Sequence, residues 1–253
     1  MAQVLRDQVA IITGAGRGIG RAYALRFADE GARLLLPDIS FERADAVARE
    51  IRDKGGKAVA MEIDISDESA TKKMAEKVIQ LYGRVDILLN NAAMFYRLEA
   101  KPWETRTVEE WDRMFEVNVK GTWLCCKAIA PLMVKQSKGK IINIASSIMK
   151  NPYGYLLLHY ACSKAAIKTM TELLARALGT SGINVNAIAP GLTMTEATSS
   201  VVKEEFNNVA AAQCIHRREQ AEDLVGTAVF LASKDSDFIT GQTIPVDGGY
   251  WLM

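Results

Sequence analysis

The sequence has only two histidines and four cysteines, and their spacing excludes several kinds of site. Cys125, Cys126, Cys162 and Cys214 form no C-x-x-C pair, and none stands near a histidine at the spacing of metal ligands. We therefore expect reduced, inert thiols, no disulfide bond and no bound metal ion.

Charge of either sign is not in excess, since 31 Lys and Arg residues face 30 Asp and Glu residues. Such a chain has no overall field that would draw it to nucleic acid or to an anionic membrane. The sequence also lacks a signal peptide after Met1 and any apolar run of about eighteen residues, the length that spans a bilayer. We expect a cytoplasmic protein without a nucleic-acid or membrane partner.

The sequence also has few features that would divide the chain into separate domains. It contains no internal repeat, no low-complexity tract and no flexible linker, and its six prolines are scattered. A length of 253 residues fits one α/β domain. The sequence therefore predicts a single domain over residues 1–253. Its least regular region, at about residues 191–213, is rich in Thr, Ser and Ala, and we expect a substrate lid there.

Short apolar segments alternate with longer amphipathic stretches along the chain. The short segments are apolar at consecutive positions, which is typical of parallel strands covered by helices on both faces of a sheet. The pattern predicts an α/β fold of the Rossmann type, a doubly wound seven-stranded parallel sheet. The expected strands cover residues 8–12, 33–36, 58–63, 86–89, 140–144, 183–187 and 243–246. The clearest helical stretches cover residues 41–53, 68–81 and 109–135.

A glycine-rich loop follows the first expected strand and leads into a helix over residues 21–28. Glycine lets the backbone approach a pyrophosphate closely, and the amides and positive dipole of a helix start favour an anion. A loop of this kind can also serve only the close packing of a helix on a strand. The order of strand, loop and helix favours a dinucleotide site, with Gly14, Gly18 and Gly20 as its critical positions.

An acidic residue, Asp38, ends the second expected strand about twenty residues beyond the glycine loop, where an adenine ribose would bind. A carboxylate accepts hydrogen bonds from ribose hydroxyls, but it repels a 2′-phosphate by about 1 to 4 kcal/mol at intermediate dielectric. The sequence therefore favours NAD over NADP. Arg17 is the competing signal, because its side chain could pair with that phosphate.

Tyr160 and Lys164 stand four residues apart in an expected helix that ends near residue 178, so they share one helix face. A phenol has an ordinary pKa of about 10, which an ammonium group and an oxidised nicotinamide would lower, and Tyr160 could then take a proton from an alcohol. Ser146 or Ser147, after the fifth strand, would donate to the developing oxyanion. Taken alone, such a pair is usually a half-buried aromatic and a solvated lysine, and the ordered set of motifs favours the catalytic interpretation.

In these motifs the chain resembles the short-chain dehydrogenase/reductase family, in its compact single-domain branch, from about Val9 to Gly249. The resemblance implies a catalytic tetrad of Asn118, Ser146, Tyr160 and Lys164, in which Asn118 holds a water that links Lys164 to a proton relay. The motifs that carry it are Thr13–Gly20, Asn90-Asn91-Ala92-Ala93, Asn118, Ser146, Tyr160, Lys164 and Pro190-Gly191. The cofactor contacts that it implies are Gly14, Arg17, Gly18, Ile19, Gly20, Asp38, Asp64, Ile65, Asn90, Asn91, Tyr160, Lys164, Pro190, Gly191, Thr193 and Thr195.

The chain departs from the family pattern at two places. Ala93 stands where the family usually has glycine, a small change. The segment from residue 153 to 159 makes the interval between Ser146 and Tyr160 longer and more apolar than usual, which bears on the substrate. The family also implies a homotetramer that pairs through the long helices and the last strand.

Residues expected around the nicotinamide are nearly all apolar or aromatic, which favours an uncharged alcohol or ketone because unpaired hydroxyls of a polar substrate would lose water on entry. We therefore expect an NAD-dependent alcohol dehydrogenase or carbonyl reductase. The alternatives are an NADPH-dependent reductase of 3-oxoacyl thioesters, a nicotinamide-sensing module without turnover, and a methyltransferase. The expected pocket comprises Met94, Phe95, Tyr96, Ser146, Met149, Tyr155, Leu156, Leu157 and Leu192.

Overall fold

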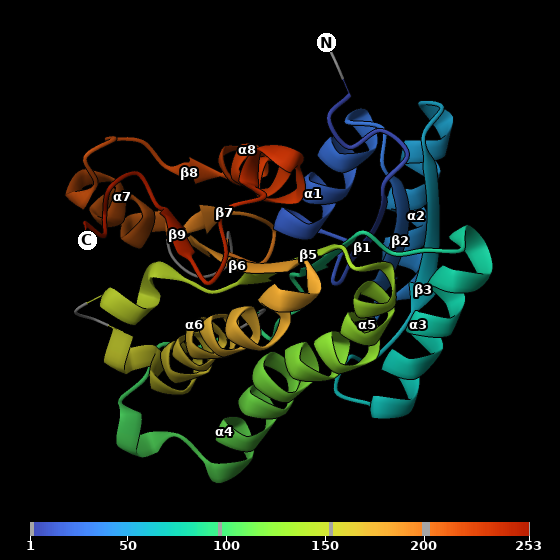
Figure 1. The fold of residues 1–253 in the computed structure, drawn as a ribbon. Coiled ribbons are helices and arrows are strands. Elements are labelled where there is room, and N and C mark those ends of the chain that lie inside the picture. Colours follow the sequence, from blue (N-terminus) through green and yellow to red (C-terminus); the bar gives the residue numbers. More distant parts are fainter. Residues whose placement is uncertain (1–2, 96–97, 152–153, 199–202, 253) are drawn as a thin grey trace.

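A parallel sheet of seven strands forms the centre of the protein (Figure 1). The computed structural model describes residues 3–95, 98–151, 154–198 and 203–252, apart from the side chains of residues 203–205. The strand order is β3-β2-β1-β4-β5-β6-β9, so the predicted doubly wound fold is confirmed. The strands are β1 (Val9–Ile12), β2 (Arg33–Asp38), β3 (Lys57–Glu62), β4 (Ile87–Asn90), β5 (Gly139–Ile144), β6 (Ile183–Pro190) and β9 (Thr243–Val246).

Helices cover both faces of this sheet, which explains why its strands are apolar at consecutive positions. In β1, Ala10 and Ile12 face one hydrophobic cluster, whereas Val9 and Ile11 face the other. The first cluster packs against α1 (Gly18–Asp29), α2 (Phe41–Asp53) and α8 (Ala221–Ala232). The second packs against α3 (Glu68–Tyr82), α5 (Thr122–Gln136) and α6 (Leu158–Leu178).

The long helix expected over residues 109–135 consists of three parts. It begins as α4 (Val108–Phe115), widens into a π-helical turn (Glu116–Gly121) and continues as α5. The threonine hydroxyl of Thr122 donates to the backbone oxygen of Asn118 at 2.7 Å, inside the widened turn. Turns of this type are rare and often lie at functional sites, and this one carries a residue of the expected tetrad.

Several shorter elements follow the carboxyl ends of β5 and β6. Two 3-10 turns (Ser147–Lys150 and Gly154–Leu157) follow β5, and a two-stranded parallel pair, β7 (Thr193–Met194) and β8 (Glu219–Gln220), lies beyond β6. The expected lid region therefore contains β7 and, further on, α7 (Lys203–Ala212), while residues 199–202 lie outside the described part. Further 3-10 turns are Trp103–Thr105, Gly179–Ser181 and Lys234–Ser236. No described helix is both long and apolar enough to cross a membrane.

Candidate active site

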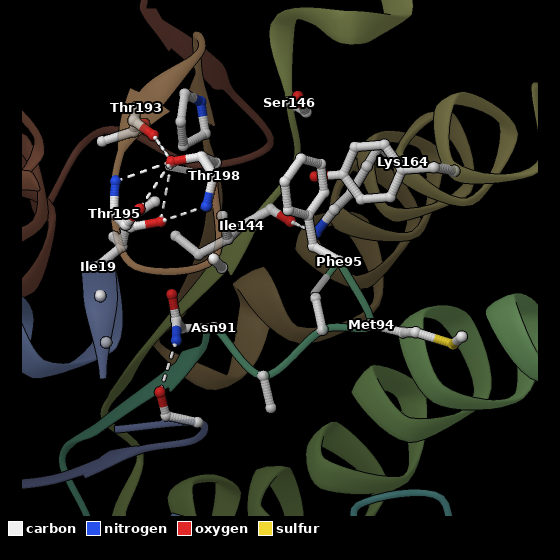
Figure 2. A pocket seen from close by; sticks show the side chains of 18 of the residues that line it. Ile19, Asn91, Met94, Phe95, Ile144, Ser146, Lys164, Thr193, Thr195 and Thr198 are labelled. Carbon is white, nitrogen blue, oxygen red and sulfur yellow. Dashed lines mark hydrogen bonds between the residues drawn. The ribbon is translucent and has the colours of Figure 1, made fainter. Parts of the chain in front are cut away.

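A cavity of about 440 Å³ runs along the carboxyl edge of the sheet, where the expected motifs meet (Figure 2). The glycine loop, Asp38 and Asp64 line one part of it. Ser146, Tyr160 and Lys164 line another part. The two predicted sets of residues, one for the cofactor and one for catalysis, therefore share a single concave site.

The glycine loop has the shape that a phosphate group requires. Gly14 and Gly18 have φ angles of 64° and 53°, which favour glycine, and a Cβ atom on Gly20 would stand 2.0 Å from the backbone oxygen of Gly14. Helix α1 begins at Gly18, inside this glycine-rich motif, and the side chain of its N-cap residue, Arg17, makes no capping hydrogen bond. The amides of the first helical turn thus remain suited to an anion, so the residues present fit a dinucleotide cofactor.

Hydrogen bonds from the segment after β4 fix the position of this loop. The hydroxyl of Thr13 accepts from the backbone amides of Asn91 and Ala92, at 3.1 and 3.0 Å. In return, the side-chain amide of Asn91 donates to the backbone oxygens of Thr13 and Gly14, both at 3.1 Å. Asn91, expected as a cofactor contact, therefore lines the cavity and also braces the loop (Figure 2).

Asp38 lies at the end of β2, as expected, and is almost fully buried. Its carboxylate accepts from the amides of Gly16 and Ser40, both at 2.9 Å, and from the guanidinium of Arg43 at 3.1 Å. Sequence reasoning missed Arg43, which lines the cavity beside Asp38. A basic residue three positions after the Ser40 cap, in the first turn of α2, is the sequence feature that could have indicated this contact with Asp38.

Tyr160 lies in the first turn of α6, and its phenol lies near enough to the Ser146 side chain for Ser146 to lower the pKa of the phenol. The ring of Phe95 packs edge-on against the Tyr160 ring, with 5.1 Å between centroids. One turn further, the ammonium group of Lys164 donates to the backbone oxygen of Ile144 at 2.7 Å (Figure 2). Of the two serines considered, Ser146 is therefore the one that meets the phenol.

Burial dominates the pKa of the Tyr160 phenol among the protein's own groups, and the lowering by Lys164 together with an oxidised nicotinamide stays a prediction. Burial raises the pKa of Tyr160 well above its ordinary value, and Ser146 opposes this only in part. Burial also lowers the pKa of Lys164 to about 8, because the ammonium group has lost its water. The ammonium lies 5.7 Å from the centroid of the Tyr160 ring, and burial is the largest influence on the pKa of each group. Among the protein groups alone, the phenol is thus held in its protonated form.

Asn118 lies behind the cavity rather than on its wall. Its side-chain oxygen accepts from the backbone amide of Met94 at 2.7 Å, and its amide donates to the hydroxyl of Ser163 at 3.2 Å. The Ser163 hydroxyl in turn donates to the backbone oxygen of Tyr160 at 2.7 Å. Asn118 therefore ties the segment after β4 to the first turn of α6, and its expected role in holding a water remains a prediction.

The structure corrects the placement of Asn90, which the resemblance implies to be a cofactor contact. Its side chain is buried inside the sheet, where the amide donates to Asn143 at 2.9 Å and to the sulfur of Cys126 at 3.3 Å. Successive side chains of a strand point to opposite faces of the sheet. The Asn90 side chain therefore points toward the face that α5 covers, away from the cavity. Asn91, one residue further, reaches the site instead.

The cavity is lined by only part of the set predicted for the substrate pocket. Met94, Phe95, Ser146, Leu157 and Leu192 line the cavity. By contrast, the side chain of Met149 packs on an inner cluster, Tyr155 is about half exposed, and Leu156 is absent from the lining. The two 3-10 turns after β5 cause this difference, because they turn successive side chains by about a third of a revolution. Tyr96 lies outside the described residues.

The structure adds lining residues that sequence reasoning missed. Ile148 and Asn151 come from the first 3-10 turn and its end, and Tyr250 comes from the carboxyl-terminal segment. No local motif marks these positions, since only the tertiary fold brings them together. The remaining expected cofactor contacts all lie on the cavity: Arg17, Ile19, Asp64, Ile65, Pro190, Gly191, Thr193 and Thr195.

Sequence comparison agrees with this geometry. A family model described as enoyl-(acyl carrier protein) reductase matches residues 14–251. Over 98% of the chain and 99% of each relative, the sequence is 38% identical to a sorbitol dehydrogenase of Cereibacter sphaeroides and 40% identical to a galactitol 2-dehydrogenase of Agrobacterium fabrum. It is 36% identical to a 3-oxoacyl-[acyl-carrier-protein] reductase of Thermotoga maritima, over 97% of the chain and 98% of that protein. The chain belongs to the short-chain dehydrogenase/reductase family.

Solved structures of similar proteins agree with this membership. A putative NAD(P)-dependent gluconate 5-dehydrogenase from Beutenbergia cavernae, with bound NADP, has a TM-score of 0.91 at 34% identity and 99% coverage of both chains. A levodione reductase has a TM-score of 0.89 at 30% identity, covering 96% of this chain and 97% of its own. This short-chain dehydrogenase/reductase is therefore an NAD(P)-dependent oxidoreductase with a Rossmann-type fold.

Proposed function

We propose that this enzyme transfers a hydride between NAD(H) and an uncharged secondary alcohol or ketone, with Tyr160 as the general acid and base. The observation that carries the proposal is that Tyr160 and Ser146 line the same cavity as the glycine loop, near enough to each other for Ser146 to lower the pKa of the phenol. Both hydroxyls can then meet one substrate oxygen. A sensor or a methyltransferase would have no use for this arrangement.

The proton chemistry follows from the state of Tyr160. When bound, the nicotinamide cofactor supplies or accepts the hydride. In the direction of reduction, the protonated phenol of Tyr160 donates its proton to the carbonyl oxygen, while Ser146 stabilises the negative charge that develops there. In the direction of oxidation, Tyr160 takes the proton from the alcohol. Lys164, fixed by the Ile144 oxygen, places a titratable ammonium group beside the phenol for both directions.

The lining of the cavity around Tyr160 favours a substrate without charge. Met94, Phe95, Ile148, Leu157 and Leu192 supply mainly apolar surface. The arginines that line the described cavity are Arg17, Arg43 and Arg113, which stand near the glycine loop, Asp38 and Asp64. Arginines thus gather at the expected cofactor end, whereas the basic group beside Tyr160 is the buried Lys164, which is bonded to the Ile144 oxygen and is not offered to an acyl carrier thioester.

A polyol is the second candidate substrate class. The sorbitol and galactitol dehydrogenases among the similar proteins support it, and so do the polar side chains of Ser147, Asn151 and Tyr250 on the cavity wall. Hydroxyl groups of a polyol need such partners, because each buried unpaired hydroxyl costs about 1 to 3 kcal/mol. The 3-oxoacyl thioester reductases among the relatives supply the third class to be tested.

A substrate screen at 340 nm separates these classes. We expect oxidation of NADH with cyclic and aryl ketones to exceed, by at least tenfold in kcat/KM, the reactions with acetoacetyl thioesters or with ketoses. A clear preference for a ketose or polyol would overturn the apolar assignment in favour of the second candidate. Tight cofactor binding without turnover across the panel would contradict an enzymatic role.

The preference for NAD is a separate proposal that rests on the buried carboxylate of Asp38. An Asp38→Asn substitution keeps the size of the side chain and an acceptor oxygen but removes the charge. Arg43 then loses the negative charge that faces its guanidinium, whose Nε atom is buried and makes no hydrogen bond within the described residues. We expect the ratio of kcat/KM for NADP to that for NAD to rise about tenfold to a hundredfold, because repulsion of the 2′-phosphate is removed. Initial rates with both cofactors measure this ratio.

The matched control adds Arg43→Ala to Asp38→Asn. In the double variant, most of the increase in the ratio of kcat/KM for NADP to that for NAD should be lost, because the guanidinium that would bind the 2′-phosphate is gone. An unchanged cofactor ratio in Asp38→Asn would show that this acid does not select the cofactor.

A further inference from the structure

Glu219 is an acidic side chain that the proposed chemistry does not use, although it is buried directly behind the cavity. It lies in β8, and only 5% of its surface is exposed. One carboxylate oxygen accepts from the hydroxyl of Thr193 at 2.6 Å, and the other accepts from the backbone amide of Gly191 at 3.1 Å. Gly191 and Thr193 both line the cavity, so Glu219 holds one of its walls from outside.

Three segments meet tightly at this point. A Cβ atom on Gly191 would stand 2.7 Å from a carboxylate oxygen of Glu219 and 3.0 Å from the Cβ atom of Asp247. The amide of Gly191 also donates to the backbone oxygen of Val246 at 3.2 Å. The segment after β6 is therefore fixed from two sides, by β8 through a side chain and by the end of β9 through the backbone.

We propose that Glu219 is a positioning residue that fixes the Gly191–Thr193 segment against the bound cofactor and makes cofactor affinity depend on its own protonation. This inference rests on the proposed cofactor site. The carboxyl group faces other charged or titratable groups from each element packed around it: Tyr23 on α1, Arg217 before β8, Asp223 on α8 and Asp247 after β9.

The protonated form of Glu219 suits this position better than the ionised form. Burial raises the pKa of Glu219 to about 7, and the nearby carboxylates of Asp247 and Asp223 add to the effect. Hydrogen bonds from Thr193 and Gly191 oppose it only in part. A neutral carboxyl group can keep both contacts, because it donates to the Thr193 oxygen and accepts from Gly191. Because the folded pKa is raised, ionisation as the pH rises through 7 weakens the held arrangement.

The test measures dissociation constants of NADH and NADPH by fluorescence at pH 6.0 and 8.5, which needs no substrate. For the wild type we expect the dissociation constants to be about tenfold higher at pH 8.5 than at pH 6.0. This ratio follows if Glu219 has a pKa of about 7 when it holds the Gly191–Thr193 segment and a pKa well below 6 when that segment is released. Glu219→Gln mimics the neutral carboxyl group, so its affinity should match the wild type at pH 6.0 and stay there at pH 8.5. Glu219→Ala removes both contacts and should weaken binding about tenfold at both values.

Glu222→Gln is the matched control, because Glu222 is an exposed acid at the start of α8. It should retain the affinity and the pH dependence of the wild type. The inference is overturned if Glu219→Ala binds both cofactors as the wild type does, or if Glu219→Gln keeps the wild-type pH dependence. Failure of the proposed reaction would instead appear as normal cofactor binding without turnover of any ketone.

Discussion

Replacing Tyr160 with Phe is expected to lower kcat by about a thousandfold or more while the dissociation constant of the cofactor stays within about twofold. General acid and base catalysis contributes about a hundredfold to ten-thousandfold, and here the phenol lies beside Ser146 with its pKa raised by burial. The substitution removes one oxygen and keeps the ring, so the edge-on packing against Phe95 persists. Steady-state rates on the best ketone, with fluorescence titration of NADH, measure both quantities.

Tyr155→Phe provides the matched control for this experiment. Tyr155 lies five residues earlier, is about half exposed and does not line the cavity. Its loss of a hydroxyl should leave kcat within about twofold of the wild type. Wild-type turnover in Tyr160→Phe would rule out the assignment of the proton donor, whatever the substrate is.

Replacing Gly20 with Ala should abolish measurable cofactor binding, with an affinity loss of at least about a hundredfold. The added methyl group would stand 2.0 Å from the Gly14 oxygen and 2.6 Å from the side-chain nitrogen of Asn91, far inside van der Waals contact. The glycine loop must therefore move, and the amides at the start of α1 lose the position that suits a pyrophosphate. Titration with NADH and NADPH measures the loss, and circular dichroism shows whether the fold persists.

Gly226→Ala is the corresponding control in a helix. Gly226 lies inside α8, and an added methyl group would meet no atom within 4 Å. This substitution should leave cofactor binding unchanged and stabilise the protein by about 0.5 to 1 kcal/mol, because alanine loses less backbone entropy than glycine in a helix. Normal NADH binding in Gly20→Ala would contradict the role assigned to the loop.

The sheet could be predicted from the sequence because local information determines it. Each expected strand overlaps an observed strand, and their consecutive apolar residues directly indicate a sheet covered on both faces. The glycine loop and the Tyr160 and Lys164 pair were found for the same reason, since each depends on spacing within a single element. Their meeting in one cavity follows from the rule that parallel strands end at the same edge.

Features that depend on distant contacts could not be predicted in this way. Arg43 and Glu219 look like ordinary surface charges in the sequence, and only the fold brings them to Asp38 and to Gly191. The two 3-10 turns after β5 decide whether Met149 or Ile148 reaches the cavity, and no periodicity marks such short turns. The electrostatics of Tyr160 also escaped sequence reasoning, because the loss of hydration depends on everything packed around the ring.

The π-helical turn between α4 and α5 has a consequence for how the residues in it and after it are oriented. A π turn holds one more residue than an α turn, so it takes up an additional amino acid without rotating the helix beyond it. The buried face of α5 packs against the sheet through Cys125, Ile129 and Met133. In the wider turn before it, Asn118 forms hydrogen bonds with Met94 and Ser163. The wider turn thus lets Asn118 and the buried face of α5 take orientations that one regular helix would not give them together.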